Sequence, residues 1–377
     1  MDYLRILDDI FSQFSCPAFA TRLWDGKTRT YGNEGTPEFT LVINDEKTAR
    51  RLVREGALGF GESYMDGSLD IEGDLEAYMR TRHQFKYVKP SLELLTATLL
   101  SRLTSPFTRS GHIAKHYDLG NDFFALFLDT ETMSYSAGLY TDEKDTLEIA
   151  QRNKLSYVHE LLALPPEARV LDLGSGWGGF MKSCVQRNHY VDGYTLSKAQ
   201  LTFVQNMIRE EGAGKHASVS YQDMTQPFPK GTYDAVVSIE SIEHVGRLHL
   251  SSFFRNVHQA LKLGGQAYIQ ATGRYAYRAV DPWTLKYVFP GGYLPTKDEL
   301  IRSATQAGFT IAEFRDDTDD YIRTMTEWIQ RLEKNQETIE RMFDSEFYRL
   351  WKLWMHGAKV AFELNSMSLF RMHIRKK

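Results

Sequence analysis

After residue 111, apolar positions follow two patterns along most of the chain, one typical of strands and one typical of helices. Short apolar runs are typical of buried strands, and they lie at residues 169–173, 190–194, 218–222, 235–239, 267–271 and 310–314. Segments with helical spacing separate most of them, at residues 180–187, 198–211, 248–262 and 297–307. This alternation predicts an α/β fold with a doubly wound, mostly parallel sheet that binds ligands at the carboxyl ends of its strands.

The same strand and helix patterns predict smaller features at both ends of the chain. Residues 368–374 alternate at period two and are expected to add a last strand at the sheet edge. Residues 39–43 predict a strand, and Asp45 is placed to cap a helix over residues 46–55. Leucines spaced by three and four residues follow Pro90 and predict an amphipathic helix. The expected parts are a small N-terminal α+β domain (1–90), a helical basic linker (91–110) and a catalytic domain (111–377).

Composition places the chain among globular proteins of a reducing compartment. The 377 residues are 42% hydrophobic and 25% charged, which suits two soluble domains. Cys16 and Cys184 fall in different expected domains and have no ligand-like spacing, so neither a disulfide framework nor a metal site is expected. No signal-peptide pattern and no run long enough to span a membrane is visible. We therefore expect a cytoplasmic protein.

The net charge of −4 hides a basic region. Residues 80–115 carry seven Lys or Arg and one acid, Glu93, and four more basic residues follow at the C-terminus, Arg371, Arg375, Lys376 and Lys377. Basic side chains near an anionic lipid surface each contribute about 1 kcal/mol of binding, so association with the inner leaflet of the cytoplasmic membrane is one interpretation. A solvated linker is the other. No nucleic-acid motif accompanies the charge, so no nucleic-acid partner is expected.

A glycine-rich loop predicts a nucleoside-containing cofactor. The run Asp-Leu-Gly-Ser-Gly-Trp-Gly-Gly at residues 172–179 joins a predicted strand to a predicted helix. Gly174, Gly176 and Gly179 also satisfy the dinucleotide pattern, so NAD is the alternative. S-adenosylmethionine (SAM) carries a cationic amine instead of a pyrophosphate, and Asp172 is placed to meet that charge. The loop therefore favours SAM. Asp192 is excluded as a ribose ligand because it falls inside the next predicted strand.

Four further motifs carry a family resemblance. They are His-Tyr-Asp-Leu-Gly-Asn-Asp-Phe-Phe at 116–124, Met-Ser-Tyr-Ser at 133–136, Glu-His-Val-Gly at 243–246 and Tyr-Val-Phe-Pro-Gly-Gly-Tyr-Leu-Pro at 287–295. With the glycine loop, this set resembles the cyclopropane-fatty-acyl-phospholipid synthase family, which includes the mycolic acid methyltransferases, over nearly the whole chain. Gly-Glu-Ser-Tyr-Met-Asp-Gly at 61–67 resembles the extra domain of the phospholipid-acting bacterial members.

The resemblance implies a fold and a reaction. The fold is the class I SAM-methyltransferase sheet, related to the Rossmann fold. In the reaction, SAM methylates the cis double bond of an unsaturated acyl chain of a membrane phospholipid, and bound bicarbonate takes a proton from the resulting cation so that a cyclopropane closes. The enzyme would be a homodimer at the membrane surface. Two alternatives stay open: a fatty-acid methyltransferase that leaves a methyl or methylene branch, and a SAM- or lipid-binding homologue without turnover.

The resemblance also assigns residues. The expected SAM contacts are Tyr135, Ser136, Gly174, Thr195, Leu196, Gln200, Asp223, Met224 and His244, in addition to Asp172 and Gly176 of the loop. The expected catalytic positions are Tyr117, Ala137, Glu243, Gln270 and Tyr321. The resemblance assigns the last four of these to bicarbonate, Ala137 through its backbone N–H.

The chain departs from the family pattern at four positions. Ala137 stands where the family usually has cysteine, Gln270 where its best-known members have histidine, Glu240 where they have glycine and Thr272 where they have an apolar residue. Glutamine donates a hydrogen bond but cannot carry a proton. The aromatic segment 274–294 is expected to form a lid or acyl wall, or to pack as an ordinary insertion.

Overall fold

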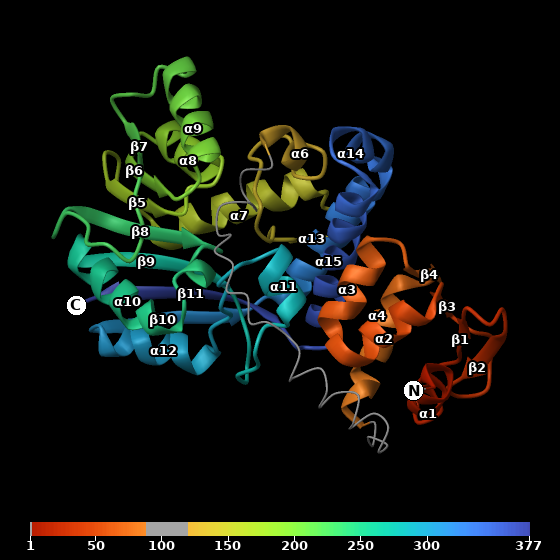
Figure 1. The fold of residues 1–377 in the computed structure, drawn as a ribbon. Helices are drawn as coiled ribbons and strands as arrows, with labels where there is room; N and C mark the ends of the chain where they lie inside the picture. Colours follow the sequence, from red (N-terminus) through yellow and green to blue (C-terminus); the bar gives the residue numbers. More distant parts are fainter. Residues whose placement is uncertain (1, 88–119) are drawn as a thin grey trace. The chain divides into compact units, whose positions relative to one another are not determined.

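The computed structural model describes residues 2–87 and 120–377, drawn in colour in Figure 1. These residues form two compact units, which are described separately. The first contains the N-terminal segment together with Asp281–Pro290 and Glu333–Val360, and the second contains the rest. The units therefore differ from the expected linear division, because two segments from within residues 111–377 pack with the N-terminal segment. The expected linker, residues 91–110, lies outside the described residues, as does its leucine helix.

The first unit is an α+β structure around one four-stranded sheet. Its strands β1 (Phe19–Arg22), β2 (Thr28–Tyr31), β3 (Phe39–Ile43) and β4 (Leu69–Gly73) take the order β2-β1-β3-β4. The predicted strand at 39–43 is confirmed as β3. The predicted cap is also confirmed, because Asp45 accepts a hydrogen bond from Thr48 N (2.7 Å) at the start of α2 (Glu46–Glu55). The other helices of the N-terminal segment are α1 (Tyr3–Phe11), α3 (Ala57–Met65), α4 (Leu75–Thr81) and η1 (Arg82–Tyr87).

The two later segments complete the core of this unit. Helix α11 (Pro282–Tyr287) packs on α3, where a Cβ on Gly61 would lie 2.2 Å from Cδ1 of Trp283, so only glycine fits. Lys286 Nζ donates to Glu62 Oε1 at 2.6 Å beside this contact. Helices α14 (Gln336–Met342) and most of α15 (Ser345–Glu363) follow. Part of the aromatic segment 274–294 is therefore a core element of the first unit, which is the insertion-packing alternative.

The second unit carries the predicted doubly wound sheet. Its seven strands take the order β10-β11-β9-β8-β5-β6-β7, which can be followed across Figure 1. They are β5 (Arg169–Leu173), β6 (Tyr190–Thr195), β7 (Ala217–Tyr221), β8 (Tyr233–Ile239), β9 (Leu261–Gly273), β10 (Phe309–Asp316) and β11 (Ser368–Lys376). Strands β7, β6, β5, β8 and β9 are parallel, while β11 runs antiparallel to both neighbours. The predicted α/β class is confirmed.

The expected edge position of the last strand is wrong. Strand β11 lies between β9 and β10, and the first seven of its residues are buried. Its period-two alternation suggested a solvent-facing side because Arg371 and His373 take alternate positions. Both are buried and bonded instead: Arg371 ion-pairs with Asp317 and Asp320, and His373 Nε2 contacts Gln266 Oε1 at 2.8 Å.

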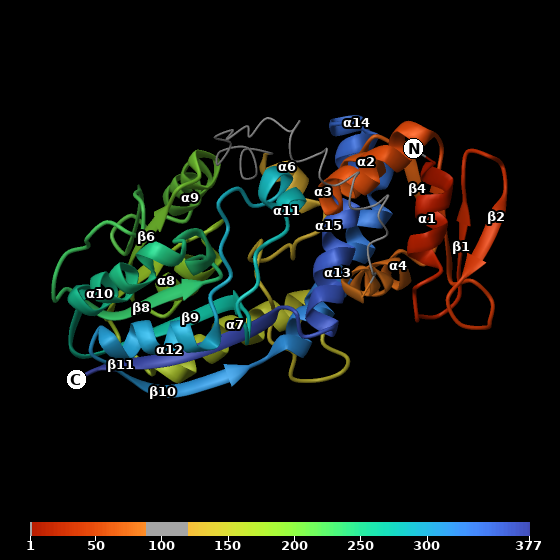
Figure 2. The same cartoon turned by 60° about the horizontal axis from the view of Figure 1, so that its bottom comes forward.

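Helices cover both faces of this sheet. Helices α7 (Leu147–Leu162), α8 (Gly179–Gln186) and α9 (Lys198–Glu210) pack on the face of Val170, while α10 (Leu250–Ala260) and α12 (Lys297–Gln306) pack together on the face of Leu171, as Figure 2 shows. The predicted helix at 248–262 ends at Ala260, because Leu261 begins β9. No helix among the described residues combines the length and the apolar character that a membrane crossing requires.

Candidate functional site

The glycine loop leaves bare backbone at the carboxyl end of β5. Gly174 (φ +86°) donates its N–H to Tyr194 O at 2.9 Å, and a Cβ there would lie 2.4 Å from Cβ of Ser241. Gly176 also has a left-handed backbone (φ +54°), yet a Cβ there would meet nothing within 4 Å. The loop is therefore packed tightly behind Gly174 and open at Gly176, as close approach of a ligand to the backbone requires.

Asp172 supplies a buried carboxylate one turn before this opening. Its side chain is buried, Oδ2 has no hydrogen-bond partner among the described residues, and burial raises its pKa to about 7. A buried charged oxygen without a partner is costly, so the position suits a ligand with a cationic group. The amine of SAM has that property.

The residues expected around the rest of SAM follow β6 and β7. Thr195 Oγ1 donates to Gln200 Oε1 (3.0 Å) and accepts from Ser197 N (3.1 Å), which ties the strand end to the start of α9. Leu196 between them is 47% exposed. After β7, Asp223 Oδ1 accepts from Thr225 N at 2.7 Å and shapes a turn. The excluded Asp192 lies inside β6 as expected.

Two further expected SAM residues differ in exposure. The Met224 side chain is buried in the core, and His244 is exposed at the end of the short 3-10 helix Ile242–His244 after β8.

Two buried charges that sequence reasoning missed hold the segment at 133–136. Asp129 accepts from Thr132 N (2.6 Å) and Ser134 N (2.7 Å). Lys154 of α7 donates to Ser136 Oγ at 2.7 Å, and burial lowers its pKa to about 8. The sequence did indicate that Lys154 is buried, because it lies on the same face of the helix as Ala150 and Val158.

Aromatic rings gather around Tyr135. Its ring stacks on Trp328 of α13 (Thr318–Lys334), with centroids 5.3 Å apart, and meets Phe124 of α6 (Asn121–Ala125) edge-on at 5.4 Å. The ring of Tyr321, expected to be catalytic, meets that of Trp328 edge-on at 6.2 Å and lies 4.3 Å from the ring of Phe362. Such faces can stabilise a cation in a site that excludes water. Tyr117 lies outside the described residues, so its expected place in this pocket stays a prediction.

The other expected catalytic residues converge after β8. Glu243 accepts from Thr272 N through Oε1, while its buried Oε2 has no partner in the part of the chain described. Burial, with a smaller contribution from the charge of Glu240, raises the pKa of Glu243 to about 8. Glu240 Oε1 accepts from Ala137 N at 2.8 Å and from Gln270 Nε2 at 2.7 Å. Two carboxyl groups thus share one end of the sheet.

Hydrogen bonds fix which way the Gln270 amide points. Its Oε1 accepts from Tyr268 OH (2.9 Å) and from Arg371 Nε (3.2 Å), and a guanidinium can only donate. The Nε2 group therefore faces Glu240 Oε1 and Ala137 O (3.2 Å).

Two basic residues of the C-terminus do not belong to a lipid-facing charge cluster. Arg371 is buried, and Lys376 Nζ donates to the carbonyls of His258 and Leu261. The prediction that these two residues contribute to a basic, lipid-facing surface is therefore wrong.

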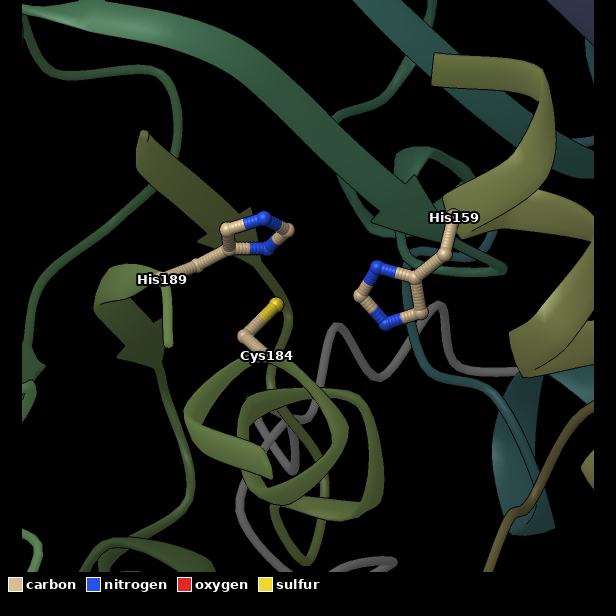
Figure 3. A group of neighbouring side chains, drawn as sticks. All are labelled: His159, Cys184 and His189. Carbon is tan, nitrogen blue, oxygen red and sulfur yellow. The ribbon is translucent and has the colours of Figure 1, made fainter. Parts of the chain in front are cut away.

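A separate group of three side chains lies in the core beside α8. His159, Cys184 and His189 point toward one another in Figure 3, with one potential ligand atom from each within 4.8 Å of the others. Structural zinc sites almost always have four protein ligands, and the described residues offer three here. His159 Nε2 lies 2.8 Å from Ser183 Oγ, and burial lowers its pKa to about 3. Packing accounts for the group, and the expected absence of a metal stays a prediction.

Comparison with known proteins places this arrangement in a family. Residues 105–372 match the model of mycolic acid cyclopropane synthetase, and residues 6–86 match a domain of unknown function, DUF7884. The chain belongs to the mycolic acid cyclopropane synthetase family. The predicted family is confirmed, and the protein is a SAM-dependent methyltransferase of lipids.

Individual relatives cover both parts of the chain. The cyclopropane-fatty-acyl-phospholipid synthase of Escherichia coli K12 is 31% identical over 90% of this chain and 88% of its own length. The tuberculostearic acid methyltransferase UfaA1 of Mycobacterium tuberculosis is 30% identical over 88% and 82%. The solved structure of the cyclopropane synthase MmaA2 from M. tuberculosis is 28% identical, with a TM-score of 0.66 over 70% of this chain and 97% of that chain. These likenesses also confirm the class I SAM-methyltransferase fold.

Proposed function

We propose that this family member transfers a one-carbon unit from SAM to the cis double bond of an unsaturated phospholipid acyl chain and closes a cyclopropane ring. The observation that carries the proposal is that a cofactor loop and a pair of carboxyl groups lie in the same unit. An open glycine loop follows the unpartnered Oδ2 of Asp172, and a pair of carboxyl groups, Glu240 and Glu243, follows β8 of the same parallel sheet. Carboxyl ends of parallel strands meet at one sheet edge, which supports a site where the methyl donor and the base would act on one substrate.

The residues at this edge suit SAM. Asp172 would meet the amine, and the backbone at Gly174 and Gly176 would approach the methionine part. Thr195 and Gln200 would hold the ribose side. Bound SAM supplies the methyl group as an electrophile on sulfur.

The chain's own contribution to the reaction is positioning and exclusion of water. An alkene is a weak nucleophile, so it must be held close to the donor and in line with it. The cation that follows must be shielded from water, and the rings of Tyr135, Trp328 and Tyr321 offer electron-rich faces for that purpose. Glu243 keeps its proton below about pH 8.

A branched product is the second candidate. It is favoured by the resemblance to UfaA1 and by a probable fatty acid methyltransferase of Pseudomonas putida, which is 26% identical over 93% of this chain and 90% of its own length. The same cation would then lose a different proton. Association with a membrane surface and a homodimer stay predictions. The expected binding of bicarbonate is untested, and the contacts of Glu240 with Ala137 and Gln270 argue against it.

The product decides between these candidates. We would incubate the purified protein with SAM and vesicles of a cis-monounsaturated phospholipid, and then examine the released acyl chains by mass spectrometry and proton NMR. The proposal predicts a gain of one CH2 and ring protons, with one S-adenosylhomocysteine formed per modified chain. Alkene protons of an exomethylene group would support the branched product. Neither product nor S-adenosylhomocysteine would support a binding protein without turnover.

A further inference from the structure

Three of the groups that the family resemblance assigns to bicarbonate, Ala137, Gln270 and Tyr321, are already engaged within this chain. The Ala137 N–H donates its single hydrogen to Glu240 Oε1. Both hydrogens of Gln270 Nε2 are used, one on Glu240 Oε1 and the other on Ala137 O. Tyr321 makes the third contact, a side-chain hydrogen bond with Glu240. Burial raises the pKa of Tyr321, and the charge of Glu240 and this hydrogen bond raise it further. An exogenous anion does not fit while Glu240 holds these donors.

The backbone of Glu240 indicates that this placement is maintained against strain. Its φ is +48°, a left-handed conformation that costs a non-glycine residue about 1–2 kcal/mol. Such strain persists only where the surroundings enforce it, and it clusters at functional sites. The enforcing contacts are in place: Arg371 and Tyr268 orient Gln270, and Arg371 is itself fixed by Asp320 at 2.8 Å.

We propose that the Glu240 carboxylate replaces bicarbonate as the base that takes the proton from the substrate cation. The inference rests on the proposed function and adds the identity of the base. Ala137 and Gln270 are then positioning residues, which hold the carboxylate at the end of β8.

The step balances without another reactant. The new carbon–carbon bond to the donated methyl leaves the second alkene carbon cationic. A Glu240 carboxylate oxygen takes one proton from that methyl, and the electron pair of the broken C–H bond forms the second ring bond. Glu240 ends as a carboxylic acid. Since its side chain is partly exposed, it returns the proton to water after the product leaves.

Two substitutions at this position test the proposal. Glu240→Gln keeps the shape and one acceptor but removes the base, and we expect turnover to fall by about 10²–10⁴-fold. Glu240→Gly removes the carboxylate and frees the donors of Ala137, Gln270 and Tyr321, so its low turnover should rise again when bicarbonate is added. Wild-type turnover should be the same in buffer freed of carbon dioxide and in buffer with bicarbonate.

The matched control is Glu167→Gly, which replaces an exposed glutamate that has the same left-handed backbone (φ +63°) before β5. It should change neither turnover nor the response to bicarbonate. A second readout does not need turnover: carbon-13 NMR with labelled bicarbonate should show binding to Glu240→Gly and none to the wild type.

Bicarbonate binding by the wild type, or turnover of Glu240→Gln near the wild-type rate, would overturn the inference. A wild type that forms no lipid product refutes the proposed function instead, and the NMR comparison still decides whether Glu240 occupies the anion position.

Discussion

At the scale of single residues, the open space at Gly176 gives the sharpest test of the cofactor site. A valine there would enter the space that the loop leaves free, so Gly176→Val should bind SAM too weakly to measure by calorimetry. Gly231→Val is the matched control, because Gly231 has a similar backbone (φ +59°) and open surroundings before β8. Thermal unfolding would confirm that both variants fold. Wild-type affinity in Gly176→Val would refute the placement of the cofactor.

Asp172 predicts how SAM binding depends on pH. The raised pKa means that the carboxyl is neutral below about pH 7 and charged above it. Affinity for the cationic amine should therefore increase as the pH rises from 6 to 8, measured as the dissociation constant. Asp172→Asn should bind more weakly, without this rise. Asp192→Asn should retain the rise, because that carboxylate is bound to Ser218 Oγ and Tyr233 OH within the sheet.

Glu243 predicts a pH dependence of turnover. Its carboxyl is protonated below about pH 8, and above that it carries a negative charge close to the Glu240 side chain. We expect kcat to fall as the pH rises through about 8. Glu243→Gln stays neutral at every pH, so it should lack this descending limb while still binding SAM. A descending limb near pH 8 in Glu243→Gln would show that another group causes it.

At the scale of elements, the inner strand β11 carries a buried arginine that joins the sheet to the site. Arg371 contacts Asp317, Asp320, Gln270 and the Gly138 carbonyl. Removing one partner of a buried ion pair costs about 3–5 kcal/mol, and that is the loss of unfolding free energy that we expect for Arg371→Met in denaturant titrations.

The control for this loss is an exposed pair. Arg152→Met breaks the ion pair with Glu131, whose side chains are both about half exposed, and should cost less than about 1 kcal/mol. Equal losses in the two variants would show that the Arg371 network does not stabilise the sheet.

The elements also show what sequence could and could not predict. The βα alternation predicted the parallel strands, because their buried runs and amphipathic helices are local patterns. The place of β11 was not predictable in this way, since Arg371 and His373 are polar residues whose partners lie far away in the chain. The role of Glu240 was hidden for a similar reason: the sequence marked it as a departure, but only the fold brings it to Ala137 and Gln270.

At the scale of the whole molecule, the linear order of the motifs predicted the family but not how the chain is divided into units. Trp283 lies within the aromatic segment expected at the catalytic part, yet it packs against Gly61 of the first unit. Contacts between distant segments decide such boundaries, and no local periodicity reports them.

The most direct test of the whole account is the fate of a labelled methyl group. The protein would be incubated with SAM that carries a CD3 group and with vesicles of a cis-monounsaturated phospholipid, and the acyl chains would be weighed. The account predicts chains heavier by CD2, because one deuteron leaves with the base as the ring closes. Label in the head group, a CD3 group retained on the chain, or unchanged chains beside intact SAM would contradict it.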